Sequence, residues 1–199
     1  MNDWLKHTEL EGENVKLIPL RLDHKEGIIS AAADGNLWEL WYTSVPSKNT
    51  IDRYMDFALN EQKNQRALPF VVLEKSTNKI IGSTRYCNVE QDHKRLEIGY
   101  TWYAKSYQKT GVNTECKYLL LKHAFETLGT IAVEFRTHWH NFSSRNAIAR
   151  LGAKQEGVLR NHRIGNDGTI RDTVVFSIIE NEWKTVKKSL EYKMNKDHK

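Results

Sequence analysis

A short basic loop, Lys105 to Gly111, runs into a strongly apolar helical stretch, and its residue types could bind an anion. The first backbone N–H groups of a helix lack intrahelical partners, and the helix dipole is positive at that end. Gly111 permits a close backbone approach or an unusual φ, while Lys105 and Lys109 add positive charge. Together these features predict a site for a phosphate or pyrophosphate group.

The composition of this loop leaves a structural alternative open, which is a well-capped helix with solvated lysines. A single glycine is a weak phosphate signal. A Walker A loop would end in Gly-Lys-Ser/Thr and a dinucleotide loop would carry three spaced glycines, and neither pattern is present. The loop is therefore not a nucleotide site of either common type.

Four other reactive side chains, two cysteines and two histidines, receive a structural interpretation. Cys116 lies on the apolar stripe of the helix after the loop, which favours a packed thiol over a covalent nucleophile. Cys87 and Cys116 show no CxxC spacing, so both are expected to be reduced and buried. His138 and His140 would face the same way on a strand, but no further ligand follows at a metal-binding spacing, so we expect no metal site.

The elements that must position these residues belong to an ordinary globular composition. The chain has 199 residues, of which 39% are hydrophobic and 28% charged, so we expect one domain over residues 1–199 with a core of about residues 15–190. The net charge of +5 suits an anionic partner. No motif indicates nucleic-acid binding, and no apolar run indicates a signal peptide or a membrane span. We therefore expect a cytoplasmic protein, disordered at most over Tyr192–Lys199.

Hydrophobic periodicity predicts alternating strands and helices along the chain. Gly152 should terminate the short helix before the closing hairpin, and Ser143 or Ser144 should lie near its N-cap. The expected strands are Val15–Leu22, two runs within residues 68–89 around a turn at Ser76–Asn78, Arg95–Tyr103, Thr130–Trp139, and a hairpin of residues 157–164 and 170–179 around a Gly-Asn-Asp-Gly turn. The expected helices are Asp23–Ala33, residues 50–64, the helix that starts near Gly111, residues 143–153, and a terminal helix through Trp183, Val186 and Leu190.

This order predicts an α/β (α+β) fold, with one mixed and mostly antiparallel sheet, a parallel β–α–β crossover over Leu96–Trp139, and helices on both faces. Several segments resemble the GNAT acyltransferase superfamily, in particular its RimJ/RimL-like branch. The loop Gln108-Lys109-Thr110-Gly111-Val112-Asn113 is similar to the family pattern Gln/Arg-x-x-Gly-x-Gly/Ala, with Asn113 at the position of the last small residue. The strand "LEIGYTWY", the segment "NFSSRNAIARLGA" and the closing stretch Glu156–Trp183 also resemble the family, and the likeness extends from Val15 to Leu190.

The resemblance implies acetyl-CoA as the acyl donor and no metal. It implies that the pyrophosphate sits on the amides of Gln108, Lys109, Thr110, Gly111, Val112, Asn113 and Thr114. The pantetheine would run beside Trp102 and Tyr103, pairing with strand backbone. Asn141 would bond the pantetheine or an ordered water. For Arg145, a contact with a CoA phosphate and a surface position are equal alternatives.

The implied reaction is direct attack of an amine on the thioester, with Glu97 as our first choice of general base. Strand alternation would place Glu97 opposite Ile98 and Tyr100, and the structural alternative is a carboxylate paired with Arg85 or Arg95. Ser144 is our candidate for protonating the leaving sulfur, with helix capping as the alternative, because Ile148 stands where many family members carry a tyrosine. Glu134 and Glu156 are less specific candidates for the base.

The acceptor pocket is expected to use Trp38, Trp41 and Tyr42, which are unusually dense for a connecting segment. The alternative is an aromatic plug for the core. The expected function is acetyl transfer to a primary amine, with a protein N-terminal α-amine as one option. A small-molecule acceptor and a non-catalytic module that binds CoA or a partner are the alternatives, and a homodimer is one option for the assembly.

Overall fold

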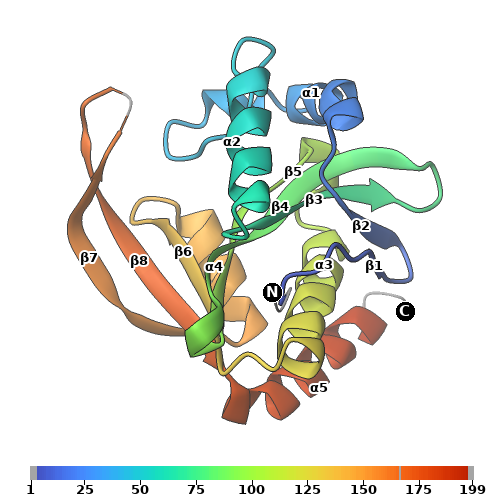
Figure 1. Ribbon diagram of the computed structural model, residues 1–199, viewed down its shortest axis with the longest axis vertical. Helices are drawn as coiled ribbons and strands as arrows, with labels where there is room; N and C mark the ends of the chain where they lie inside the picture. The colour runs from blue at the N-terminus through green and yellow to red at the C-terminus, as the bar shows by residue number, and fades with distance from the viewer. Residues whose placement is uncertain (1–3, 166, 197–199) are drawn as a thin grey trace.

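The computed structural model describes residues 4–165 and 167–196. Its centre is one eight-stranded sheet with the order β1-β2-β3-β4-β5-β6-β8-β7 (Figure 1). All neighbouring strands are antiparallel except β5 and β6, which are parallel and connected through α3. The strands are β1 Leu10–Glu11, β2 Val15–Pro19, β3 Leu68–Glu74, β4 Lys79–Glu90, β5 Arg95–Tyr103, β6 Ala132–His138, β7 Lys154–Ile164 and β8 Ile170–Ile179. The expected mixed sheet with one parallel crossover is confirmed.

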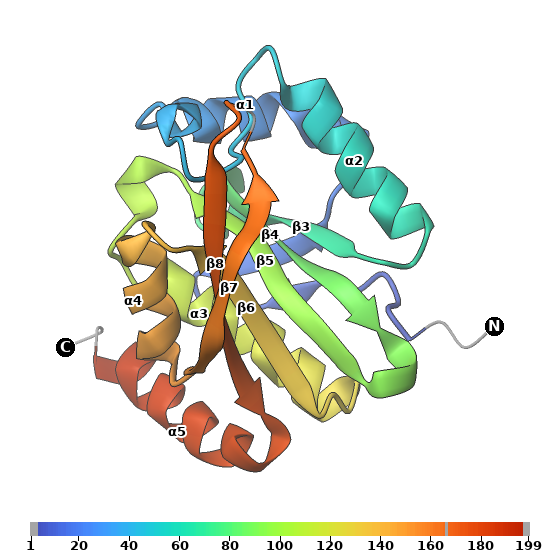
Figure 2. The same cartoon turned by 90° about the vertical axis from the view of Figure 1, so that its left-hand side faces the viewer.

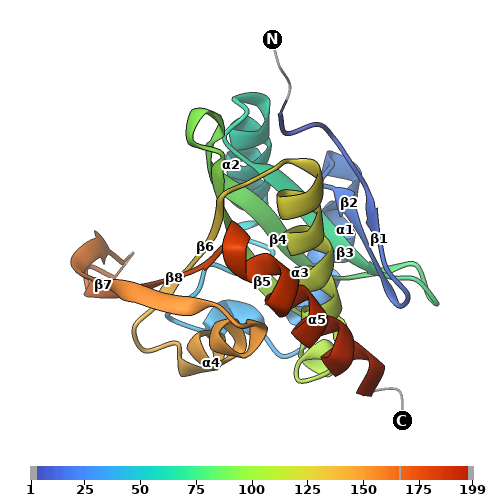
Figure 3. The same ribbon diagram turned by 90° about the horizontal axis from the view of Figure 1, so that it is seen from below.

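Five α-helices cover the two faces of this sheet, as expected. On one face α3, α4 and α5 bury side chains such as Leu120, Ile148 and Trp183, and α3 and α5 lie side by side (Figure 3). On the other face α1 and α2 bury Ile28 and Met55 in a second cluster, while β7 and β8 lie toward the viewer below these helices (Figure 2). The helices are α1 Lys25–Ala33, α2 Ile51–Lys63, α3 Val112–Lys122, α4 Phe142–Leu151 and α5 Glu180–Lys196.

Local residue chemistry determines both ends of α4. Helix α4 begins at Asn141, whose side-chain oxygen accepts from the Ser144 N–H, and it ends at Gly152 with a φ of 102°. The terminator is therefore as predicted, and Ser143 and Ser144 lie in the first turn near the N-cap, also as predicted. The capping oxygen comes from Asn141, so the alternative role of Ser144 as the helix cap is wrong.

Most expected elements are present with small shifts at their ends. Short helical turns Leu22–His24, Leu37–Glu39, Gln91–His93 and Lys105–Tyr107 were not expected, nor was the short strand β1 or the π-type turn His123–Thr127 after α3. Helix α5 continues to Lys196, so Tyr192–Lys196 is helical rather than disordered, and residues 197–199 lie outside the described part. The turn between β7 and β8 includes Asn166, which is also outside it. None of the helices within residues 4–165 and 167–196 has the length and apolarity that a membrane span requires.

Candidate active site

The two parallel strands at the centre of the sheet separate partway along their length. Residues Arg95–Glu97 of β5 pair with Ala132–Glu134 of β6, and the pairing ends there. Beyond this point β5 continues against β4 up to Tyr103, and β6 continues against β8 up to His138. One edge of β5 after Glu97 is thus left without a neighbouring strand, and an extended ligand could pair with such an edge.

A β-bulge at Tyr100 changes which residues of β5 share a face. The register of β4 and β5 shifts between Ser83 and Arg85, and Tyr100 has a φ of 51°, so one extra residue is accommodated. Ile98 faces the core under α3, whereas the Tyr100 ring lies 6.2 Å from that of Phe57 in α2. The expectation that Glu97 faces opposite to both Ile98 and Tyr100 is therefore half wrong, because the bulge brings Tyr100 onto the face of Glu97.

Glu97 is buried, with 7% of its surface exposed, at the point where β5 and β6 separate. Asn88 Nδ2 donates to its Oε2 at 2.6 Å, and Arg136 Nε lies 3.6 Å from the same oxygen. Burial raises its pKa above the ordinary value, although the Asn88 hydrogen bond and the charge of Arg136 act in the opposite direction. A carboxylate with a raised pKa is a better proton acceptor near neutral pH.

The arginine partners proposed for Glu97 from the sequence are wrong. Arg95 forms an ion pair with Glu134, and Arg85 forms none among the described residues. Glu134 also binds Arg136, at 2.9 Å, so this alternative base is engaged by two arginines. Glu156, the other alternative, accepts a hydrogen bond from Ser177 Oγ.

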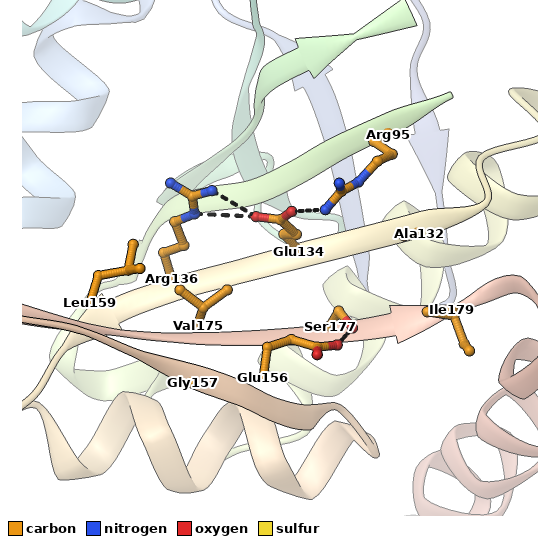
Figure 4. A pocket seen from close by; sticks show the side chains of 10 residues that line it. All are labelled: Arg95, Ala132, Glu134, Arg136, Glu156, Gly157, Leu159, Val175, Ser177 and Ile179. Carbon is orange, nitrogen blue, oxygen red and sulfur yellow. Dashed lines mark hydrogen bonds and ion pairs between the residues drawn. The ribbon is translucent and has the colours of Figure 1, made fainter. Parts of the chain in front are cut away.

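A hollow of ≈ 480 Å³ lies on the part of the sheet formed by β6, β7 and β8, and Arg95 of β5 also lines it, whereas Glu97 does not. Figure 4 shows Arg95, Glu134 and Arg136 along one side of it, and Glu156 with Ser177 along the other. Arg136 connects this hollow to Glu97, because its guanidinium contacts both Glu97 and Glu134. Arg136 was not expected at the site, although its strand position, two residues after Glu134, places both side chains on one face.

The loop before α3 differs in detail from the expectation. Gly111 has helical angles, with a φ of −67°, so of the two roles considered for it the unusual φ is wrong and the close backbone approach remains. Lys109 has a positive φ instead, of 61°. A Cβ added at Gly111 would meet no atom within 4 Å. The glycine thus leaves open space in front of the helix N-terminus, which is the room that a bound phosphate group would need.

The remaining loop residues organise this N-terminus. Thr110 Oγ1 donates to the Tyr107 carbonyl at 2.7 Å and lies 3.3 Å from the Val112 N–H, while Gln108 Nε2 donates to the Tyr103 carbonyl at 3.0 Å. The N-cap residue of α3 is Gly111, which has no side chain to cap the helix, and Thr110 Oγ1 accepts from the Val112 N–H instead. Among the residues expected there, Asn113 lies in this turn, and Thr114 is buried with its hydroxyl against Arg150.

At the start of α4, Asn141 and Arg145 are engaged within the protein. The Asn141 side-chain oxygen caps the helix. Arg145 donates to the Trp139 carbonyl at 3.2 Å and lies over the Trp139 ring. The half-buried Ser144 hydroxyl makes no hydrogen bond within the described residues, and its backbone N–H binds Asn141. Because Asn141 caps the helix, the Ser144 side chain is not needed for helix capping, which was the structural alternative considered for it.

The aromatic residues divide into two groups. Trp102 and Tyr103 are buried on opposite faces of the sheet, so β5 can offer a ligand its backbone there, with both side chains in the cores. Trp38 and Trp41 are 37% and 63% exposed, and the half-buried Tyr42 contacts Trp41. An aromatic core plug is therefore wrong for the two tryptophans.

Trp41 lies against both histidines at the end of β6. Its ring centroid is 4.9 Å from that of His138 and 5.9 Å from that of His140. No group of three His, Cys, Asp or Glu residues within the described part of the chain could hold a metal ion. The connecting segment after α1 thus reaches the end of β6.

Of two buried groups on α3, Cys116 is packed as expected, whereas Lys117 was not expected to be buried. Burial raises the pKa of Cys116 to about 12, which fits a packed thiol. Lys117, one residue later, is buried and donates to Thr101 Oγ1 at 2.5 Å and Thr84 Oγ1 at 3.3 Å. Burial lowers its pKa to about 8. The sequence signal that could have identified Lys117 is its position on the inner face of α3, because a lysine on an apolar stripe is unusual.

Comparisons with known proteins identify this architecture. The sequence pattern of the acetyltransferase (GNAT) domain matches residues 14–154. The chain belongs to the GNAT acetyltransferase family. A GCN5-related N-acetyltransferase from Brucella melitensis is 25% identical, with a TM-score of 0.84 over 95% of this chain and 86% of that one.

One further curated relative and one further solved structure add to this comparison. YdaF of Bacillus subtilis (strain 168), named provisionally as a ribosomal N-acetyltransferase, is 33% identical over 48% of this chain and 51% of its own length. The Mycobacterium smegmatis RimJ structure, solved with CoA-disulfide, shares the fold at 22% identity, with a TM-score of 0.75 over 89% and 88% of the chains. These neighbours agree with the RimJ/RimL-like branch.

Proposed function

We propose that this GNAT protein transfers an acetyl group from acetyl-CoA to a primary amine, and that Glu97 accepts the proton of the attacking amine. The observation that carries this proposal is the buried Glu97 at the point where β5 and β6 separate. There a carboxylate with a raised pKa stands beside an unpaired strand edge.

The residues present fit acetyl-CoA. The open space at Gly111 and the start of α3 could receive its pyrophosphate, with backbone N–H groups of the segment Gln108 to Thr114 as donors, except that the Gln108 N–H is bound by the Lys105 carbonyl and the Val112 N–H by Thr110 Oγ1. The unpaired edge of β5 at Trp102 and Tyr103 could hold its pantetheine arm by backbone hydrogen bonds. Bound acetyl-CoA supplies the activated acetyl thioester. Asn141 and Arg145 are the residues proposed to contact it from the start of α4.

In the proposed reaction the amine nitrogen forms a bond to the acetyl carbon as the carbon–sulfur bond breaks. Glu97 takes the proton that the nitrogen loses, directly or through a water. The Ser144 hydroxyl hydrogen-bonds or protonates the departing sulfur, because it has no competing partner within the described chain. Trp38, Trp41 and Tyr42 would form the acceptor wall.

The acceptor is a primary amine, and a protein N-terminal α-amine is one form of it. The named relatives support this form, since they include ribosomal-protein acetyltransferases. A small-molecule amine is the second candidate, supported by the hollow of ≈ 480 Å³ on β6, β7 and β8.

The test is thiol release from acetyl-CoA with a panel of peptides and small amines. Release that depends on an added amine supports the transferase. Tight acetyl-CoA binding without release for any amine would instead indicate a module that binds CoA without turnover.

A further inference from the structure

Arg85, in the middle of β4, is the most unusual buried group of the described chain. Only 1% of its surface is exposed. Its Nε, Nη1 and Nη2 atoms are all buried, and none has a hydrogen-bond partner within residues 4–165 and 167–196. A guanidinium group has five N–H donors and stays charged at every physiological pH. Burying it without a partner is strongly unfavourable, so its retention indicates a partner that comes from outside the chain.

Aromatic rings surround the Arg85 guanidinium. Its central carbon lies 4.0 Å from the ring centroid of Tyr100, 5.1 Å from that of Tyr54 and 5.9 Å from that of Phe57. These rings attract a cation but do not satisfy its N–H donors. Tyr100 and Phe57 are 36% and 48% exposed, so they form the outer cover. Rotation of the Tyr100 side chain would therefore open a path from the surface to the guanidinium.

Two more arginines lie around Tyr100. Arg163 of β7 and Arg171 of β8 are directly paired across the closing hairpin, and Arg171 Nε is buried without a partner. Burial and then the charge of Arg163 lower the pKa of Arg171. The charges of Arg85 and Arg163 both lower the pKa of the Tyr100 hydroxyl, although burial raises it overall. Arg163 and Arg171 thus lie within electrostatic range of Tyr100, and neither they nor Arg85 form an ion pair among the described residues.

This cluster occupies the same face of the sheet as Glu97. Arg85 is paired across the strands with Gly99, and Cys87 is paired with Glu97. Arg85 and Glu97 therefore point to the same face of the sheet from neighbouring strands, offset by two residues along them. Glu97 is already bound by Asn88 and Arg136. An acceptor that presents its amine to Glu97 would have its next polar group near Tyr100 and the three arginines.

We propose that the acceptor amine carries a carboxylate or phosphate group, and that Arg85 binds this group with Arg163 and Arg171 around it. This inference rests on the proposed acetyl transfer. A guanidinium binds both anions through two parallel N–H···O bonds, which would satisfy the donors that now lack partners. The same cluster would repel polyamines and other cationic acceptors.

The test compares matched acceptors that differ only in the anion. Suitable pairs are O-phosphoethanolamine with ethanolamine, β-alanine with its amide, and a peptide that starts Ser-Asp with one that starts Ser-Asn. The anionic member should show at least a tenfold higher kcat/KM in the thiol-release assay, mainly through a lower KM. The small amines and the peptides distinguish the two sources of the anion.

The variants are Arg85→Met, Arg171→Gln and the surface control Arg53→Met in α2. Arg85→Met should lose the preference for the anion while its acetyl-CoA affinity is kept, and its Tm should equal or exceed that of the wild type, because an unpaired buried charge is removed. Arg171→Gln should reduce the preference, which covers the case that Arg85→Met does not fold. The control should change neither.

Equal kcat/KM within every pair would overturn the inference and leave the transferase intact. A preference that survives in both Arg85→Met and Arg171→Gln would also overturn it. If no amine releases thiol, the proposed function is wrong, and a binding measurement then tests the anion site by itself. A Tm increase caused by O-phosphoethanolamine with CoA, present in the wild type and absent in Arg85→Met, would still support the anion site, and its absence in both would reject it.

Discussion

At the scale of single residues, the candidate site consists of charges that the fold has removed from water. Glu97 keeps two hydrogen-bonding or ionic partners, Asn88 and Arg136, and burial still raises its pKa. Arg85, on the same face, lies against aromatic rings and has no side-chain hydrogen-bond partner among the described residues. Perturbed or unpaired buried charges concentrate at functional sites, and these two lie on neighbouring strands at the bulge of β5.

Replacement of Glu97 by Gln should lower kcat/KM by about 10²–10⁴-fold, which is the usual contribution of a general base. The wild-type rate should rise with pH as Glu97 loses its proton, at a pH above the ordinary range of a glutamate, and Glu97→Gln should lack this limb. A pH–rate profile of thiol release measures both effects. Glu156→Gln is the matched control, and a larger loss in that variant would move the base to Glu156.

The same substitution should not reduce stability at neutral pH. A folded-state pKa above the unfolded value means that the Glu97 contribution to stability is fully present below the unfolded pKa of about 4.5, and is lost as pH rises through the folded pKa. Above that window the wild type holds a poorly solvated carboxylate that Gln lacks. Urea denaturation at pH 7 should therefore show Glu97→Gln to be at least as stable, and a large loss would indicate a structural ion pair.

At the scale of elements, α3 connects the two halves of the site. Its N-terminus carries the loop from Gln108 to Asn113, and its inner face carries Lys117 against Thr84 and Thr101 behind the bulge. Helix and bulge are therefore in contact, so a change in one can affect the position of the other.

Gly111→Ala separates the loop's role in binding from its role in folding. The backbone angles at Gly111 suit alanine, and the added methyl group meets no protein atom. Stability should be unchanged or rise by about 0.5–1 kcal/mol, while acetyl-CoA affinity should fall at least tenfold, as calorimetric titration would show. Gly157→Ala, also in open space, is the control and should keep its affinity. Unaltered binding in Gly111→Ala would remove this loop from the cofactor site.

Lys117→Met should stabilise the protein at pH 7 by on the order of 1–3 kcal/mol, because burial lowers the pKa of the lysine to about 8. Because the folded-state pKa is lowered, the contribution of Lys117 to stability is fully present above the unfolded pKa of 10.5 and is lost as pH falls through about 8. The advantage of Lys117→Met should therefore shrink between pH 8 and 10. Denaturation curves across this range test it, with the exposed Lys122→Met as control. A destabilised Lys117→Met at every pH would show that the threonine hydrogen bonds dominate.

At the scale of the whole molecule, one sheet joins two hydrophobic clusters, with α1 and α2 on one face and α3, α4 and α5 on the other. The unpaired edge of β5 and the start of α3 are surrounded by strands and helices that are far apart in the sequence (Figure 1). A donor bound there would contact several elements at once and would stabilise the native state relative to the unfolded chain.

Acetyl-CoA should therefore raise the melting temperature. At a concentration of about 100 times its Kd, a ligand of the native state adds about 2.7 kcal/mol, which corresponds to about 5–10 °C for a chain of this size. Differential scanning fluorimetry measures the shift, with adenosine as a ligand that lacks pyrophosphate and pantetheine. The absence of any shift at millimolar acetyl-CoA would contradict the cofactor assignment.

Periodicity was sufficient for the order of the elements, because each strand and helix buries a contiguous apolar face whose spacing is visible locally. It was not sufficient at Tyr100, where one extra residue in β5 shifts the alternation. The partner of Glu97 was missed for a related reason. Arg136 lies on the next strand and 39 positions along the chain, so only strand pairing brings the two together.

The sequence by itself determined the fold class, the GNAT family and the loop before α3, since motifs and hydrophobic periods are properties of neighbouring residues. The tertiary structure alone decided where β5 and β6 separate, that Asn141 rather than a serine caps α4, and that Arg85 is buried without a partner. The physical reason is that burial and pairing depend on residues from distant segments. The charge environment of Glu97, and with it the chemistry of the site, arises only when those segments pack.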